Sequence, residues 1–192
     1  AEQVDEKKIE FLYHSINDTQ ATIRAIDVKI GFLFVVIFLP LAAIDGISKA
    51  LLVLWASPNH FGSISIFVGV VWLLSVYFLF KSLSAITDIQ KHMIGVMPDD
   101  TFFKGGMPFI GMKHLFSIDD VRAEKSVGDY LKSLPKNEIE LLSELASEKM
   151  KVSLIRNVKA LRVKVCTNLT LLWLAFGMFL SVVFLFKIGL SA

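Results

Sequence analysis

The sequence contains few of the residues with which proteins build covalent or metal-bound sites. Its single cysteine, Cys166, excludes an internal disulfide framework and cysteine-rich zinc sites. The four histidines, His14, His60, His92 and His114, lie in separate segments without the spacing of metal ligands. A Gly-x-Ser-x-Gly nucleophile motif is also absent. We therefore predict no catalytic residues, no metal site and no cofactor.

Apolar residues, in contrast, are in excess and lie in blocks. They make up 54% of the chain, against about 45–50% in ordinary soluble domains. A membrane-spanning helix needs about 20 mainly apolar residues to cross about 30 Å of hydrocarbon. Residues 30–56, 63–81 and 166–187 meet this requirement, and the mixed-charge residues before them are not expected to be a secretory signal. The sequence predicts an all-α membrane protein with three transmembrane helices.

The first apolar block is interrupted by charged residues and a proline. Lys29 and Lys49 lie 20 residues apart, about 30 Å of helix, so their side chains could reach opposite membrane interfaces. Asp45 lies four residues before Lys49, which is the spacing of a helical ion pair. The two residues form either an interfacial pair at the outer helix end or a functional charged site within the membrane. Pro40 is expected to kink this span.

Lysine and arginine are distributed unevenly among the connecting segments. Residues 1–29 carry four and residues 81–164 carry fourteen, whereas the link 57–62 carries none. Basic segments are retained in the cytoplasm during membrane insertion. We therefore predict a cytoplasmic N-terminus, cytoplasmic residues 82–165, and an outer tail at 188–192.

Residues 1–29 are predicted to form an amphipathic helix that continues into the first span. Ile9, Ile16, Ile23 and Ile30 recur every seven residues, and Thr19 interrupts this stripe. The stripe requires a packing partner, either another segment of the chain or a neighbouring subunit. We predict a homo-oligomer.

Residues 82–165 are predicted to form a small layer of helices. Residues 82–95 extend the second span, and a loop with several Gly and Pro follows. Another helix begins at Ser117, capped through Asp120, and ends at Pro135. An unbroken helix from about residue 137 to residue 187 then enters the third span. Its apolar residues near one face are Leu142, Leu145, Val152, Ile155, Val158, Leu161 and Val165.

Two segments are candidates for binding a phosphate-containing ligand. Phe102, Phe103 and Lys104 precede two glycines, but the order of a nucleotide phosphate loop is missing, so this segment is either a phosphate cradle or a flexible connector. Residues 149–164 carry six positive charges and no acid. They either anchor the chain at the cytoplasmic face or bind anionic headgroups or a phosphate ligand, with Lys159 and Arg162 as candidate contacts. Basic and aromatic residues are too sparsely interleaved to predict nucleic-acid binding.

The order of these segments resembles that of the transmembrane effectors of the Pycsar antiphage system. The likeness covers about residues 11–187 and includes "RAIDVKIGFLF", "TFF" and "SLIRNVKALRVKVCTNLTLLWL". The matching positions are Asp27, Lys29, Phe102, Phe103, Tyr130, Lys159 and Arg162. The resemblance implies a bacterial inner-membrane protein that responds to a cyclic pyrimidine nucleotide, cCMP or cUMP, made after phage infection. Such effectors impair membrane integrity and stop the infected cell.

The sequence therefore favours a membrane effector that acts in the lipid bilayer without catalysis. Candidates for gating at the membrane boundary are Asp27, Lys29, Asp45 and Lys49. One alternative is a non-enzymatic anchor or subunit that docks a soluble partner through its cytoplasmic helices. A small transporter or channel is a third interpretation, which two charged residues in three spans support poorly.

Overall fold

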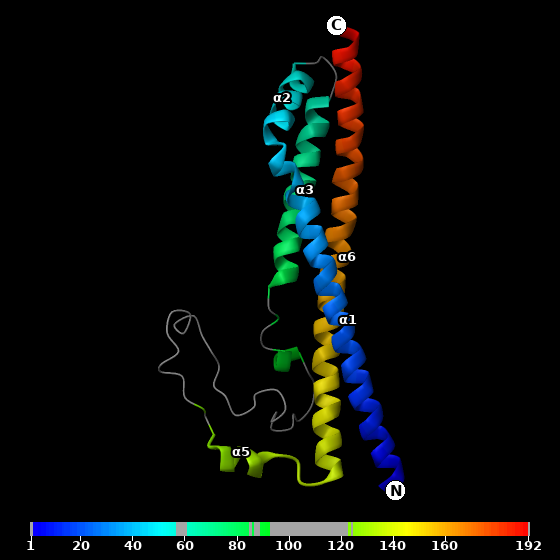
Figure 1. Cartoon of the computed structure of the whole chain (residues 1–192), viewed down its shortest axis with the longest axis vertical. Coiled ribbons are helices and arrows are strands. Elements are labelled where there is room, and N and C mark those ends of the chain that lie inside the picture. The colour runs from blue at the N-terminus through cyan, green and yellow to red at the C-terminus, as the bar shows by residue number, and fades with distance from the viewer. Residues whose placement is uncertain are drawn as a thin grey trace. The chain divides into compact units, whose positions relative to one another are not determined.

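The computed structural model describes residues 2–56, 61–84, 86, 89–92, 123 and 125–191, and every element in them is a helix. The helices are α1 (Glu2–Ala42), α2 (Ile44–Trp55), α3 (Phe61–Leu83), η1 (Ile89–His92), α5 (Val127–Ser133) and α6 (Glu138–Ser191), shown in Figure 1. Segments of α1, α3 and α6 are long and apolar enough to cross a membrane. The predicted helical class and the three membrane-crossing helices are thus confirmed for the described residues.

The chain divides into two compact units. Unit 1 comprises Ala1–Ala21 and Thr87–Ile155, and unit 2 comprises Thr22–Ile86 and Arg156–Ala192. Helices α1 and α6 contribute residues to both units, since α1 has 41 residues and α6 has 54 residues without a break. The predictions that the N-terminal amphipathic helix continues into the first span, and that one helix runs from about residue 137 to residue 187, are confirmed.

The isoleucine stripe of α1 is its buried face. In unit 1, Ile16 is 3% exposed and Thr19 is buried beside it. In unit 2, Ile26, Ile30 and Ile37 are buried and belong to the main apolar cluster. The cluster also includes Leu79 of α3 and Val163 and Cys166 of α6. Within unit 2, α1 therefore packs against both other long helices (Figure 1).

The helix expected from Lys29 to Lys49 is not continuous, because α1 ends at Ala42 and α2 begins at Ile44, close to the Pro40 at which a kink is predicted. Pro40 explains the break, since it offers no backbone N–H and its ring crowds the preceding turn. The chain tightens there through a bond from the Ala43 N–H to the Pro40 carbonyl, 3.1 Å long. Helix α2 then packs against α3.

A tryptophan of α3 binds the α1 backbone just before this break. The Trp72 indole N–H donates to the Ile37 carbonyl oxygen at 2.8 Å. Pro40 lacks the N–H that would pair with the Val36 carbonyl, so this stretch of α1 is short of backbone partners. Trp72 therefore joins α1 to α3 where the α1 backbone is weakest.

Small polar side chains, not large apolar ones, fill much of the contact surface of α3. Ser75 and Ser82 are 0% and 1% exposed, on the same face as Val71 and Leu79. Each serine hydroxyl donates to the carbonyl four residues earlier, at 3.0 Å and 2.7 Å. Cys166 of α6 approaches closely enough to contact the Ser75 carbonyl, with the sulfur 3.5 Å from the oxygen. Small residues with internally paired hydroxyls allow this close helix packing in membranes.

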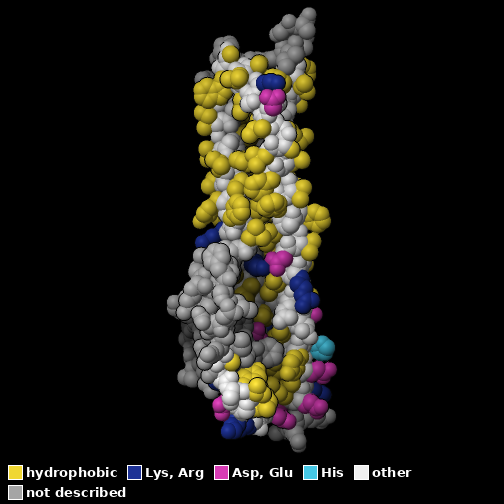
Figure 2. Space-filling model, turned by 60° about the vertical axis from the view of Figure 1, so that its left-hand side comes forward, with side chains coloured by type: hydrophobic (Ala, Val, Ile, Leu, Met, Phe, Trp, Pro, Cys, Tyr) yellow, Lys and Arg dark blue, Asp and Glu magenta, His cyan; other side chains and the backbone are white. Residues whose placement is uncertain are grey.

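The outer surface of unit 2 is mainly apolar. Phe32, Leu52, Leu73, Leu171 and Met178 are each 60% exposed or more. On the face shown in Figure 2, hydrophobic side chains form a broad yellow band, with charged side chains near its upper and lower ends. Contiguous apolar surface of this extent is not found on soluble monomers. Large apolar side chains on the outside, with small residues where α3 contacts its neighbours, are the distribution expected for helices in a bilayer.

Two helix predictions outside the spans are wrong. Helix α3 ends at Leu83, so residues 82–95 do not extend it: Ile86 lies outside any helix and the short η1 begins at Ile89. The helix predicted from Ser117 to Pro135 is interrupted, because Ala123, Lys125 and Ser126 are not helical and α5 begins at Val127. Ser117 and Asp120, which form the predicted cap, lie outside the described residues. Ser126 caps α5 by accepting a hydrogen bond from the Asp129 N–H.

We expect Trp72→Phe and Trp173→Phe to differ in their effect on stability. Trp72→Phe removes the bond to Ile37, whereas the indole N–H of buried Trp173 has no hydrogen-bond partner among the described residues. Both substitutions remove the same ring volume, so the difference reports the bond, about 1 kcal/mol. Thermal unfolding in detergent should give a Tm about 2–4 °C lower for Trp72→Phe than for Trp173→Phe. Equal Tm values would mean that the bond contributes nothing.

Candidate functional site

Charged residues of unit 2 gather where its three long helices leave the apolar band. Six of the charged residues of unit 2 lie in this region: Asp27 and Lys29 on α1, Lys81 on α3, and Lys159, Arg162 and Lys164 on α6. Four of them, Asp27, Lys29, Lys159 and Arg162, are candidates from the sequence. We call this group the boundary cluster.

An ion pair in the boundary cluster joins α1 to α6. Lys159 Nζ lies 2.6 Å from Asp27 Oδ1. The Lys159 side chain is 18% exposed and that of Asp27 is 49% exposed, so one side of the pair remains open to solvent. A partly exposed pair of this kind contributes about 0–1 kcal/mol. The contact therefore positions the two helices more than it stabilises them.

Arg162 makes the second inter-helix contact of the cluster. Its Nη1 donates to the Lys81 carbonyl oxygen at 2.7 Å. Lys81 lies in the last turn of α3, where carbonyl groups have no intrahelical N–H partner and the helix dipole favours a cation. The guanidinium thus caps α3 from α6, a role that the sequence does not reveal because the acceptor is a backbone atom.

Lys29 and Lys164 have a different setting. Both line a groove between α1 and α6 in unit 2, and neither forms an ion pair with a described residue. That Lys29 lies at the membrane boundary stays a prediction. Lys164 was not a candidate from the sequence, although its place beside the third apolar block was a usable signal.

Asp45 and Lys49 lie on α2, away from the boundary cluster. Lys49 Nζ is 2.8 Å from Asp45 Oδ2, and the two side chains are 73% and 81% exposed. A charged pair this exposed is tolerated only where water reaches it, because an ion in hydrocarbon is costly. The geometry favours the interpretation as an interfacial pair over that of an acid inside the membrane.

Unit 1 has its own polar contact between α1 and α6. Lys149 Nζ donates to the Ser15 carbonyl oxygen at 2.9 Å and to the Thr19 hydroxyl at 2.5 Å. Thr19 is the residue that interrupts the isoleucine stripe. A polar residue in such a stripe fixes the register of the partner helix. Thr19 in the isoleucine stripe therefore indicated a specific polar partner, which is Lys149. This signal was not used in the sequence analysis.

Two further charged residues, Glu148 and Lys151, are buried on α6 in unit 1, at 5% and 3% exposure. Buried charges are retained only where other polar groups compensate their lost hydration. Sequence reasoning grouped Lys151 with the solvent-facing charges of residues 149–164, because spacing along a helix does not reveal which charges a neighbouring segment covers.

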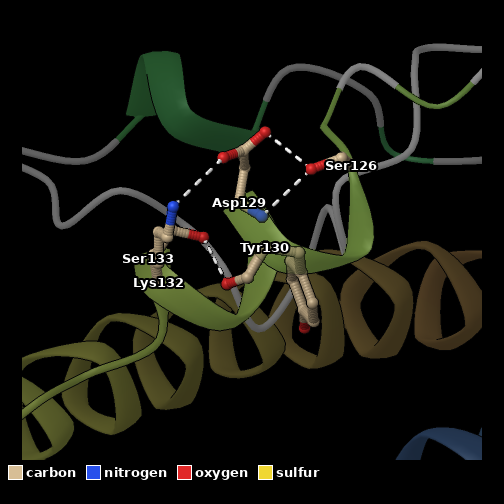
Figure 3. A network of polar contacts seen from close by, with 5 residues as sticks. All are labelled: Ser126, Asp129, Tyr130, Lys132 and Ser133. Carbon is tan, nitrogen blue, oxygen red and sulfur yellow. Dashed lines mark hydrogen bonds and ion pairs between the residues drawn. The ribbon is translucent and has the colours of Figure 1, made fainter.

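The remaining ligand candidates are separate from the boundary cluster. Phe102, Phe103 and Lys104 lie outside the described residues. Tyr130 is half-buried on α5 in unit 1, next to the cap formed by Ser126 and Asp129, in which the Ser126 hydroxyl lies 2.6 Å from Asp129 Oδ2 (Figure 3). Lys132 lies 4.0 Å from the other Asp129 oxygen. These contacts form the helix cap and leave the role of Tyr130 a prediction.

The described residues offer few side chains for a metal site or a nucleophile. They contain no group of three or more His, Cys, Asp or Glu side chains placed to hold a metal ion. Cys166 is buried in the apolar cluster of unit 2. The boundary cluster offers five cations and one carboxylate, and its ion pair between helices is of modest strength.

Comparisons of the chain with protein-family models, curated proteins and solved structures find no match.

We expect that exchanging the charges of Asp27 and Lys159 restores the stability that each single charge reversal removes. Asp27→Lys and Lys159→Asp should each lower the Tm in detergent, and the double reversal should recover most of the loss, up to about 1 kcal/mol of coupling. The same exchange of Asp45 and Lys49, both more than 70% exposed and within one helix, is the matched control and should show less than about 0.5 kcal/mol. No recovery in the first double variant would contradict the observed contact.

Proposed function

We propose that this chain is a membrane effector that converts a signal at its extramembrane helices into a change in the packing of its spans. One observation carries the proposal: α1 and α6 each run unbroken out of the apolar segment and are joined by Asp27 and Lys159 at its boundary. A rigid helix transmits displacement along its axis, whereas a loop at the boundary would absorb it. The chain acts by conformational change and not by catalysis.

The distribution of basic residues supports one orientation. Residues 81–164 hold fourteen of the 20 Lys and Arg residues, which supports a cytoplasmic location for them and for the N-terminus. The resemblance to Pycsar effectors implies that the membrane is a bacterial inner membrane. The boundary cluster then faces the cytoplasm, and the Asp45–Lys49 pair lies near the outer surface.

The proposed signal is a cyclic pyrimidine nucleotide, cCMP or cUMP. It is supported by the resemblance to Pycsar effectors at Asp27, Lys29, Lys159 and Arg162. A cyclic phosphate requires cationic donors, and the boundary cluster supplies them on two helices. A ligand anion that competes with Asp27 for Lys159 would loosen α1 from α6 at the boundary. Loosened spans then rearrange, in a homo-oligomer, and the bilayer leaks.

A second function, docking of a soluble partner, is supported by exposed apolar residues in unit 1. Phe11, Val127 and Ile139 are 69%, 79% and 77% exposed. Apolar surface of this kind on polar helices is suited to another protein. The two functions differ in their effect on the bilayer. An effector makes the bilayer leak, whereas a docking subunit leaves it sealed.

Dye release from liposomes that contain the purified chain tests the proposal. We expect release with cCMP or cUMP and none with cAMP or cGMP, because the proposed signal is a pyrimidine nucleotide. Sealed liposomes with all four nucleotides would overturn the effector function and favour the docking subunit.

The same assay separates ligand contact from helix positioning at Lys159. If its ammonium binds the nucleotide phosphate, Lys159→Gln should raise the half-maximal nucleotide concentration by about 10-fold or more, the usual value of a charged hydrogen bond. Asp27→Asn, which removes only the partner, is the control and should change it by less than about fivefold. Equal shifts in the two variants would show that Lys159 positions α1 and does not contact the ligand.

The orientation is tested by cysteine labelling, for which the buried Cys166 gives a low background. A membrane-impermeant maleimide should label Ala56→Cys, at the end of α2, in intact cells. It should label Lys136→Cys, just before α6, only after the membrane is permeabilised. Both positions are exposed, so access is decided by the membrane. The reverse pattern would invert the proposed topology.

A further inference from the structure

A groove runs between α1 and α6 in unit 2, starting at the boundary cluster. Its volume of about 530 Å³ is in the range of small-molecule sites, about 300–1,000 Å³. The two helices run in the same direction here, since residues 26–36 of α1 face residues 160–168 of α6 across it (Figure 1). The groove therefore follows the helix axes from the boundary toward the apolar middle of the spans.

The groove has one cationic end and an apolar length. Lys29 and Lys164 are its charged lining residues, and both are exposed. Phe32 and Leu33 lie about one turn beyond Lys29 and Val36 lies about two turns beyond it. On the α6 side, Ala160 and Val163 precede Lys164, and the polar residues Thr167 and Asn168 follow it deeper in the groove. In a membrane, the lysines lie at headgroup level and the apolar residues at acyl-chain level.

A further copy of this chain cannot neutralise these two lysines. Residues 149–192 contain no Asp or Glu, and between residues 28 and 84 the only acid is Asp45. Asp45 already pairs with Lys49, and Asp27 already pairs with Lys159. A parallel neighbour in the same membrane therefore brings no unpaired carboxylate to this level. The phosphate of a phospholipid, in contrast, lies at headgroup depth with its acyl chains attached.

We propose that the groove is a binding site for an anionic phospholipid. The headgroup phosphate lies between the Lys29 and Lys164 ammonium groups and offsets their mutual repulsion. One acyl chain runs along Phe32, Leu33 and Val36 of α1. Basic pockets between helices at the membrane interface select anionic headgroups, and this groove adds the apolar floor that a soluble phosphate does not use. The site depends on the membrane location of the spans and not on any nucleotide signal.

Native mass spectrometry of the full chain in detergent tests the site. With equal amounts of dioleoyl phosphatidylglycerol and dioleoyl phosphatidylcholine, the unmodified chain should retain the anionic lipid preferentially. The double variant Lys29→Gln/Lys164→Gln should lose this preference by about 25-fold, since each basic residue near the surface contributes about fivefold. The matched control is Arg24→Gln/Lys81→Gln. It makes the same charge change near the same boundary but outside the groove, and should keep the preference.

Two further experiments distinguish a phospholipid from a free phosphate as the bound anion. Soluble glycerol phosphate should not displace the bound lipid, because it lacks the acyl chain; displacement would show a site for free phosphate. Val36→Phe, which keeps both lysines and narrows the apolar floor, should weaken phosphatidylglycerol retention. A preference unchanged in the groove double variant, or lost equally in the control, would overturn the proposal. A dimer that forms in place of the bound lipid would assign the groove to a second copy.

Discussion

The burial of one face of α1 against α6 is the interaction on which the rest of this structure depends. A stripe that repeats every seven residues stays on one side of a helix over many turns. In unit 1 the stripe includes Ile16 and Thr19, and the Lys149 ammonium binds Thr19. In unit 2 it includes Ile30 and Ile37 in the apolar cluster. Because the same face is used along both parts of α1, the helix has no reason to end at the membrane boundary.

The outer surface of unit 2 is apolar, unlike that of a soluble domain, and this explains how α3 is held. In hydrocarbon the outer surface gains nothing by being buried, so helices associate through close packing and interhelical hydrogen bonds. Ser75 and Ser82 give α3 a narrow contact face, and Trp72 adds a bond to the α1 backbone. Arg162 adds another bond at the end of α3. Helix α3 is thus fixed at two levels by side chains that donate to carbonyl groups.

Much of the fold follows from the sequence because length and breaker residues decide it. The limits of α6 and the buried stripe of α1 were predictable, since no Pro or Gly interrupts 137–176 and the isoleucines keep their period. The face of α6 within the span was not predictable. Leu161 belongs to the predicted stripe but is 63% exposed, while Val163 is buried. Where lipid covers one side and protein the other, both sides are equally apolar, so hydrophobic periodicity no longer identifies the buried one.

The candidate site was predictable in its residues but not in its partners. Asp27 and Lys159 stand out because charges beside a span are conspicuous, yet 131 residues separate them and only the parallel packing of α1 and α6 pairs them. The Arg162 acceptor is a carbonyl group, which side-chain identity never reveals. Likewise the end of α3 at Leu83 depends on no breaker residue nearby, so the sequence favoured a longer helix.

The strength of the boundary contacts limits how such a protein can switch. Moving a two-state equilibrium from 1:99 to 99:1 requires about 5.5 kcal/mol of differential binding. The half-exposed Asp27–Lys159 pair contributes about 1 kcal/mol at most. It can therefore bias the equilibrium but cannot hold one state alone. The larger share must come from surfaces that change partners when α1 and α6 move, chiefly the apolar cluster around Ile30 and the groove beside it. A lipid in that groove would stabilise the packed state in proportion to its occupancy, so the composition of the bilayer would set the threshold at which a signal separates the two helices.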